Sequence, residues 1–125
     1  MKTILLAEHD AFLINVYSSQ LRKSGYSTII ALNGESAILR VKNINPDLLV
    51  LDAGLPNPPI DGGGLEVLKA IRQDLGLKNL KVVMLSDFEQ QEYISKSKQF
   101  GVIKCFLKAE NTAEDIVEGI KAILN

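Results

Sequence analysis

The sequence is poor in cysteine, in long apolar runs and in excess charge, and each shortage removes a class of protein. Cys105 is the single cysteine, so the chain has no internal disulfide, as is usual in a reducing compartment. The apolar run at the start is too short for a secretory signal before it meets Glu8 and Asp10. No stretch approaches the roughly 18 apolar residues of a membrane span. We therefore expect a cytoplasmic protein that does not enter a membrane.

The near balance of charge argues against a polyanionic partner. The chain has 14 Lys and Arg residues against 15 Asp and Glu residues, a net charge of -1, which gives no bulk attraction for nucleic acid or an anionic membrane. With 125 residues, 46% of them hydrophobic, the chain suits one globular domain with one core. We expect a single domain over residues 1–125 and no direct contact with nucleic acid.

Short apolar runs alternate with longer segments of helical period along the whole chain. The runs predict β-strands over residues 3–7, 26–31, 48–51, 81–85 and 103–107. The periodic segments predict helices over residues 11–24, 35–43, 65–75, 89–100 and 112–124. Asn33 and Thr112 are suitable helix caps. This alternation implies an α/β fold, in which a five-stranded parallel sheet is covered by five helices on both faces.

The third strand is the centre of the predicted sheet. Its run, Leu48 to Leu51, is the most apolar in the chain, as burial on both faces requires, and it ends at Asp52. Residues 53–64 then hold three of the four prolines and four glycines, which predicts a loop. Because Gly62, Gly63 and Gly64 are consecutive, we expect this loop to move more than the other loops at the strand ends.

Polar and charged residues follow four of the five predicted strands. They are Glu8, His9 and Asp10 after the first strand, Asp52 after the third, Ser86 and Asp87 after the fourth, and Lys108 after the fifth. Ligands of doubly wound parallel sheets bind beyond the carboxyl ends of the strands. We therefore expect these side chains to meet in one site.

These residue types suit the transfer of a phosphoryl group. Clustered carboxylates bind a hard divalent cation such as Mg²⁺, and an aspartate such as Asp52 can attack phosphorus to form an aspartyl phosphate. Lys108 and the Ser86 hydroxyl can contact the phosphoryl oxygens and offset their charge. Taken singly, Asp52 and Ser86 could be turn or helix caps, and Lys108 a solvated lysine. Glu8 could simply favour the positive end of the first helix. Because all four residues are expected at the same edge of the sheet, we favour a functional site over these separate structural roles.

Several segments, in this order and spacing, resemble the receiver domains of bacterial two-component response regulators. The resemblance covers essentially the whole chain and is carried by residues 4–8 (ILLAE), 46–52 (PDLLVLD), 55–56 (LP), 64–72 (GLEVLKAIR) and 82–86 (VVMLS), and by Gly101 followed seven residues later by Lys108. It implies a flavodoxin-like three-layer fold with strand order 2-1-3-4-5. It also implies Mg²⁺-dependent phosphorylation by a histidine kinase or phosphotransfer protein, and relay to an effector protein or domain.

The resemblance implies a role for each matching position. Asp52 would be the phosphoacceptor, and Lys108 the lysine that pairs with the phosphate. Ser86 would be the switch hydroxyl that moves toward the phosphoryl group. Glu8 would be the outer member of the acidic pair, and the backbone carbonyl of Gly54 would join it and Asp52 as a metal ligand.

The chain departs from the family's pattern on the metal side of this site. His9 stands where the family usually has a second acidic residue that touches the metal, and neutral imidazole is a poor Mg²⁺ ligand. We therefore expect weakened Mg²⁺ binding, which an aspartate at position 9 would restore. The alternative is that His9 points to solvent and that Asp10, one position further, or water completes the shell.

Other departures lie on the switch side. Cys105 matches the family's aromatic switch position, and the adjacent Phe106 is expected to face the other side of the sheet. Ala109 replaces the family's usual proline, and the loop after Pro56 is longer than usual.

These features leave hypotheses from different classes. The first is a phosphorylation-controlled switch, with chemistry limited to self-phosphorylation and self-dephosphorylation on Asp52. The second is a degenerate receiver that binds other proteins without being phosphorylated, which His9 and Cys105 favour. A flavodoxin-like cofactor binder shares the fold, but no Gly-rich phosphate loop follows the first strand. An aspartate-nucleophile phosphatase would carry a second aspartate where this chain has Gly54.

Overall fold

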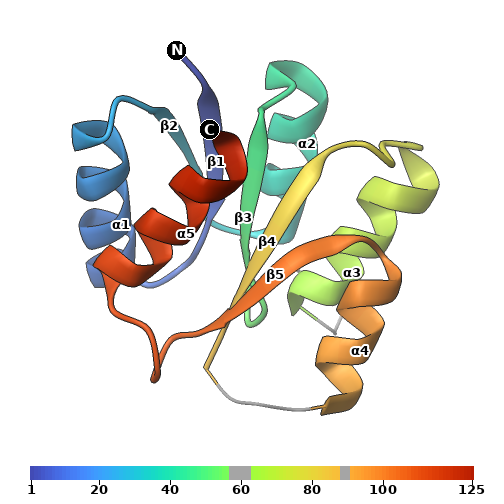
Figure 1. Ribbon diagram of the computed structural model, residues 1–125. Helices are drawn as coiled ribbons and strands as arrows, with labels where there is room; N and C mark the ends of the chain where they lie inside the picture. The colour runs from blue at the N-terminus through green and yellow to red at the C-terminus, as the bar shows by residue number, and fades with distance from the viewer. Residues whose placement is uncertain (57–62, 88–90) are drawn as a thin grey trace.

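The computed structural model, which describes residues 1–56, 63–87 and 91–125, contains a five-stranded parallel sheet in the order β2-β1-β3-β4-β5 (Figure 1). Every neighbouring pair of strands is parallel. The strands are β1 Thr3–Ala7, β2 Ser27–Ala31, β3 Leu48–Asp52, β4 Lys81–Ser86 and β5 Val102–Leu107. The predicted flavodoxin-like fold and its strand order are therefore confirmed.

Helices cover both faces of the sheet, as Figure 1 shows. The described helices are α1 Ala11–Lys23, α2 Gly34–Ile44, α3 Gly63–Lys69, the π-helical segment η1 Ala70–Asp74, α4 Gln91–Gln99 and α5 Ala113–Leu124. One core lies between the sheet and α1 with α5. The other lies between the sheet and α2, α3 and α4. Among the helices described, none combines the length and the apolar character that crossing a membrane requires.

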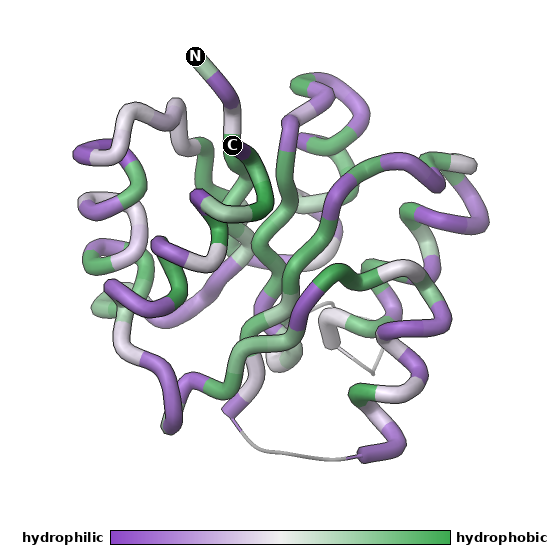
Figure 2. Tube along the Cα trace, viewed as in Figure 1, coloured by the Kyte–Doolittle hydropathy of each residue, from purple (hydrophilic) through white to green (hydrophobic). Residues whose placement is uncertain are grey.

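The two cores exist because the central strands are apolar on both faces. β3 is buried along its whole length, and its side chains alternate between the two layers. Leu49 and Leu51 pack into the core of α2, α3 and α4, whereas Leu48 and Val50 pack into the core of α1 and α5. Figure 2 shows the same concentration of hydrophobic residues along the central strands. The Asp52 side chain at the carboxyl end of β3 is thereby buried.

Local sequence signals set the helix ends near the site. The Asp10 carboxylate accepts a hydrogen bond from the Leu13 N–H, at 3.1 Å, and caps α1. Asn33 caps α2 and Thr112 caps α5 in a capping box, as predicted. α2 ends at Ile44, and its C-cap residue Asn45 has a left-handed φ of 52°. Pro46 follows directly and prevents a longer helix.

The predicted loop over residues 53–64 and the helix that follows it differ in part from the structure. α3 begins at Gly63, so the last two residues of the predicted loop are helical. The start of α3 lies against the end of β3, where a Cβ atom on Gly64 would come within 2.5 Å of the Asp52 carbonyl oxygen. Glycine is needed at this position because the two backbones pack closely. The sequence pattern alone instead indicates that the consecutive glycines make the loop mobile. The prediction of a mobile, lengthened loop concerns residues 57–64, of which residues 57–62 lie outside the described part of the chain.

The predicted helix over residues 65–75 also changes character at Ala70, where η1 begins. In the widened turn the Leu75 N–H donates to the Ala70 carbonyl, at 3.1 Å. This i→i+5 hydrogen bond is the π-helical pattern, which occurs mostly as single turns within α-helices. The predicted helix over residues 89–100 corresponds to α4, and residues 88–90 lie outside the described part of the chain.

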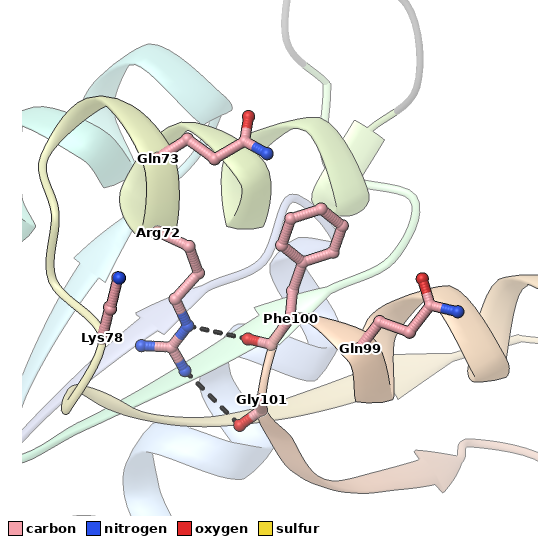
Figure 3. A pocket seen from close by; sticks show the side chains of 6 residues that line it. All are labelled: Arg72, Gln73, Lys78, Gln99, Phe100 and Gly101. Atoms are coloured by element: carbon pink, nitrogen blue, oxygen red, sulfur yellow. Dashed lines mark hydrogen bonds between the residues drawn. The ribbon is translucent and has the colours of Figure 1, made fainter.

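Arg72, within η1, ties the amino edges of β4 and β5 together (Figure 3). The side chain is 8% exposed. Its guanidinium donates to the carbonyls of Phe100 at 2.7 Å, Leu77 at 2.6 Å and Gly101 at 3.4 Å. Burial lowers the pKa of Arg72 from its usual value. A cavity of about 350 Å³ lies beside this contact, lined in part by Arg72, Phe100 and Lys78. The guanidinium therefore acts as a clamp on the edge opposite Asp52.

Replacing Arg72 with methionine should lower the free energy of unfolding by about 2–4 kcal/mol, because three carbonyls lose a charged donor. Gln73→Ala, at the exposed neighbouring position, is the matched control and should change it by less than about 0.5 kcal/mol. Urea titration followed by far-UV circular dichroism measures both. Equal losses in the two variants would show that the clamp contributes nothing.

Candidate functional site

The carboxyl ends of four strands bring the predicted site residues to one edge of the sheet. Asp52 and Ser86 are the last residues of β3 and β4, and Glu8 directly follows β1, its N–H donating to the Ala31 carbonyl at 3.1 Å. All three predicted residues are buried. Lys108 follows β5, and its N–H donates to the Ser86 carbonyl at 2.8 Å. The parallel topology alone accounts for this meeting.

The two carboxylate oxygens of Asp52 have different partners. Oδ1 accepts hydrogen bonds from Lys108 Nζ and from the Gly54 N–H, both at 3.1 Å. Oδ2 is 2.8 Å from Nδ1 of His9. The turn after β3, in which the Leu55 N–H donates to the Asp52 carbonyl at 3.1 Å, points the Gly54 N–H back at the carboxylate. The side chain of Asp52 is thus oriented on both sides.

Glu8 is held by the start of the first helix. Its Oε1 accepts hydrogen bonds from the backbone N–H groups of His9 at 3.0 Å and Asp10 at 3.2 Å. Its Oε2 lies 3.0 Å from Lys108 Nζ but is fully buried and accepts no well-aligned hydrogen bond within the described residues. This buried oxygen depends on the positive charge of Lys108, and a metal cation would share or compete for the same oxygen.

The site holds more negative than positive charge. Lys108, which is only 10% exposed, pairs with both Glu8 and Asp52. Burial and the neighbouring Asp52 raise the pKa of Glu8 above its usual value. Burial would lower the pKa of Lys108, but Asp52 and Glu8 together raise it. Two buried carboxylates that share one ammonium favour the arrival of a further cation.

The imidazole of His9 faces the carboxylates. Its Nδ1 is 2.8 Å from Asp52 Oδ2 and 3.5 Å from Glu8 Oε1, with 45% of the side chain exposed. One donor atom from each of Glu8, His9 and Asp52 lies within 4.8 Å of the others. Asp10, the alternative completing residue, uses its carboxylate to cap α1 and is not in this group. The donor set that faces a cation is therefore two carboxylates and one imidazole, which fits a divalent ion.

Tyr93 on α4 is a residue near the site that the sequence pattern did not single out. Its hydroxyl accepts from the Leu65 N–H at 3.0 Å and donates to the Ala53 carbonyl at 3.3 Å. Burial raises the pKa of Tyr93 to about 12. A small cavity of about 60 Å³ lies between Tyr93, Ser86 and the loop after Asp52. Tyr93 therefore links α4 to the residues beside the Asp52 carboxylate.

The predicted division of β5 between the two faces is confirmed. Cys105 is half-buried against the core of α2, α3 and α4, and burial raises the pKa of its thiol. Phe106 belongs to the opposite core and fills the space above Gly119, where an added Cβ would lie 2.6 Å from the ring. The aromatic ring of β5 is therefore on the α5 side, and the position nearer α4 carries a thiol.

The Glu8 carboxyl should titrate above its usual 4.5, because burial and Asp52 both oppose its charge. Carboxyl ¹³C chemical shifts measure the midpoint. Asp52→Asn should lower that midpoint and Lys108→Met should raise it; shifts in the reverse directions would contradict the pairing described above. A raised carboxyl pKa means that folding favours the protonated form, so the Glu8 contribution to stability falls as pH rises from 4.5 through the folded-state pKa.

Known proteins share both sequence and fold with this chain. Residues 4–121 match the response regulator receiver domain family. The chain is 25% identical over 123 residues to the polar-differentiation response regulator DivK of Brucella anthropi, covering 98% of this chain and 96% of that protein. It is 38% identical over 72 residues to the alkaline phosphatase synthesis transcriptional regulatory protein PhoP of Bacillus subtilis, which is 58% of this chain and 28% of that protein.

Solved structures superpose over nearly the full length. A CheY-like response regulator receiver domain protein from Methanospirillum hungatei has a TM-score of 0.86 and 24% identity, covering 99% of this chain and 94% of that one. A DNA-binding response regulator of the LuxR family from Staphylococcus aureus has a TM-score of 0.85 and 27% identity, covering 100% of both chains. The chain therefore belongs to the receiver domains of two-component response regulators.

Proposed function

We propose that this receiver domain is a phosphorylation-controlled switch, in which Asp52 accepts a phosphoryl group from a histidine kinase or phosphotransfer protein. The observation that carries the proposal is the Asp52 carboxylate itself. It is 1% exposed, is oriented by the Gly54 N–H, and has a lysine ammonium at 3.1 Å. A buried, oriented carboxylate beside a fixed positive charge suits attack on a phosphoryl group.

The transfer exchanges one bond to phosphorus for another. An oxygen of Asp52 attacks the phosphorus of the donor, and the phosphorus–nitrogen bond of the donor phosphohistidine breaks with its electron pair going to the leaving nitrogen. Lys108 offsets charge on the phosphoryl oxygens as the bond forms. Glu8 and Asp52, with the carbonyl of Gly54, would hold a divalent cation here. When bound, that cation would supply further neutralisation of the phosphoryl charge.

Ser86 would convert the new charge into a change of shape. A phosphoryl group adds roughly -1.5 to -2 charges to Asp52, and the Ser86 hydroxyl at the end of β4 is a donor that can turn toward it. Its carbonyl is hydrogen-bonded to the Lys108 N–H, and the small cavity beside it is shared with Tyr93. Movement of Ser86 would therefore reach β5 and α4, from which an effector protein or domain would read the state.

One observation favours a second function, a degenerate receiver that binds proteins without phosphorylation. Both oxygens of Asp52 already have partners, Lys108 on Oδ1 and His9 on Oδ2. A His9 that keeps its contact would compete with the phosphoryl group and the cation for the same oxygen. The two functions differ in whether Asp52 gains a phosphoryl group at all.

With Mg²⁺ and acetyl phosphate, the wild-type chain should gain one phosphoryl group and Asp52→Ala should gain none, as read from the intact mass. Asp74→Asn, which changes an exposed acid in η1, is the matched control and should be phosphorylated like wild type. Equal gain in wild type and Asp52→Ala would identify a different acceptor. No gain in either would favour the degenerate receiver.

Ser86→Ala should still be phosphorylated but should transmit less of the change, because it lacks the donor that turns toward the phosphoryl group. Amide chemical-shift changes at residues 102–108 on phosphorylation, measured by ¹⁵N–¹H correlation spectra, should be smaller than in wild type. Identical changes in both proteins would show that the switch does not pass through this hydroxyl.

A further inference from the structure

We propose that His9 Nδ1 is a metal ligand and that it makes this site select a transition-metal cation, Zn²⁺ foremost, over Mg²⁺. The inference rests on the proposed function only in using the same acidic site. It concerns the identity of the cation, which the presence of a phosphoacceptor does not decide. It also accounts for a histidine directed at two buried carboxylates.

The donor atoms of Glu8, His9 and Asp52 lie within 4.8 Å of one another, close enough to contact one ion after small side-chain adjustments. Nδ1 of His9 lies 2.8 Å from Asp52 Oδ2 and 3.5 Å from Glu8 Oε1. Neighbouring ligands of an ion bound at about 2.1 Å are separated by roughly 3.0–3.4 Å in octahedral or tetrahedral geometry. An ion could therefore take the place of the His9–Asp52 contact with only a small adjustment of the imidazole.

The chemistry of the donors selects among cations. Mg²⁺ prefers oxygen ligands in a near-ideal octahedron and keeps several of its waters. Imidazole nitrogen instead suits Zn²⁺, Cu²⁺ and Ni²⁺, and Zn²⁺ also accepts carboxylate oxygens. One imidazole and two carboxylates supply three ligands of a tetrahedral zinc ion, and the fourth position is left for the Gly54 carbonyl, water or a phosphoryl oxygen.

The protein positions these donors before any ion arrives. Glu8 Oε1 is held by two backbone N–H groups, and Oε2 is buried with the Lys108 ammonium 3.0 Å away. Asp52 Oδ1 is held by Gly54 and Lys108, which leaves Oδ2 on the His9 side. The imidazole, 45% exposed, lies between these oxygens and solvent, so it can meet an ion as it enters. Positioned outer partners of this kind commonly change metal affinity by about 10–100-fold.

The imidazole of His9 lies beside Gly54, at a distance where even a Cβ atom would make only an ordinary van der Waals contact. An added Cβ at that residue would lie 3.9 Å from His9 Cε1 and 3.8 Å from Asp52 Oδ1. The imidazole therefore packs close to the turn after β3 without collision, and its Nδ1 side, rather than its Nε2 side, is the one that meets the carboxylates. This orientation yields a definite spectroscopic expectation for Nδ1.

Isothermal titration calorimetry of Zn²⁺ and of Mg²⁺ against wild type, His9→Gln and His9→Asp tests the selection. His9→Gln should weaken Zn²⁺ binding by about 10-fold or more, because it removes the nitrogen ligand while keeping a neutral polar side chain. His9→Asp should tighten Mg²⁺ binding and reduce the ratio of Zn²⁺ to Mg²⁺ affinity at least 10-fold, since it supplies a hard oxygen. Unchanged Zn²⁺ affinity in His9→Gln would overturn the inference.

The ligand atom can be identified directly, because His9 is the only histidine of the chain. On addition of Zn²⁺, the ¹⁵N resonance of Nδ1 should move to the position of a metal-bound nitrogen, and Nε2 should keep its proton. The Cys105→Ser background removes the one thiol as an alternative zinc ligand and should leave this result unchanged. A metal-bound Nε2, or an unshifted imidazole at saturating Zn²⁺, would refute the assignment.

Failure of this inference and failure of the proposed function give different results. If wild type gains a phosphoryl group on Asp52 with Mg²⁺ but Nδ1 never binds Zn²⁺, the switch stands and the cation assignment falls. If Zn²⁺ binds through Nδ1 but Asp52 gains no phosphoryl group with Mg²⁺ or Zn²⁺ in either wild type or His9→Asp, the cation assignment stands and the switch falls.

Discussion

The arrangement of this site depends on one unbalanced set of charges: two buried carboxylates, Glu8 and Asp52, that share the ammonium of Lys108. Burying a charge is costly unless it is paired and hydrogen-bonded. The central strands are apolar on both faces and end at the same edge of the sheet. Backbone N–H groups and Lys108 therefore converge on the two carboxylates and offset the cost of burying them. The remaining negative charge is what makes the edge receptive to a cation or to a group that brings one.

The same edge is connected to β5 and α4. The backbone of Lys108 is bonded to Ser86, and Tyr93 joins α4 to the residues beside Asp52. The opposite edge is tied by Arg72, whose guanidinium holds three backbone carbonyls. In the proposed switch, a rearrangement at Asp52 would pass into β5 and α4, while the Arg72 clamp holds the amino edges of β4 and β5 in place. Because the Arg72 edge of the sheet is held, a small shift at the Asp52 edge would move the carboxyl ends of β4 and β5 relative to their fixed amino ends.

His9 distinguishes the acidic site of this receiver domain from the family's usual pattern. An acidic residue in its place would add a third carboxylate, and hence more negative charge, to a site that already has excess. The imidazole supplies a donor without that charge, and its nitrogen changes which cations the site suits. Because Nδ1 of His9 lies 2.8 Å from Asp52 Oδ2, the proposed cation and the proposed phosphoryl group would both have to accommodate this contact.

The sequence by itself determined the five strands and five helices, the caps at Asn33 and Thr112, and the convergence of Glu8, Asp52, Ser86 and Lys108, because these follow from local periodicity and the chirality of parallel crossovers. Only the tertiary structure decided where His9 and Asp10 direct their side chains, why Gly64 must lack a Cβ, and how Arg72 and Tyr93 join segments 28 residues apart. Each of these depends on the position of atoms contributed by distant parts of the chain, and no local pattern encodes such positions.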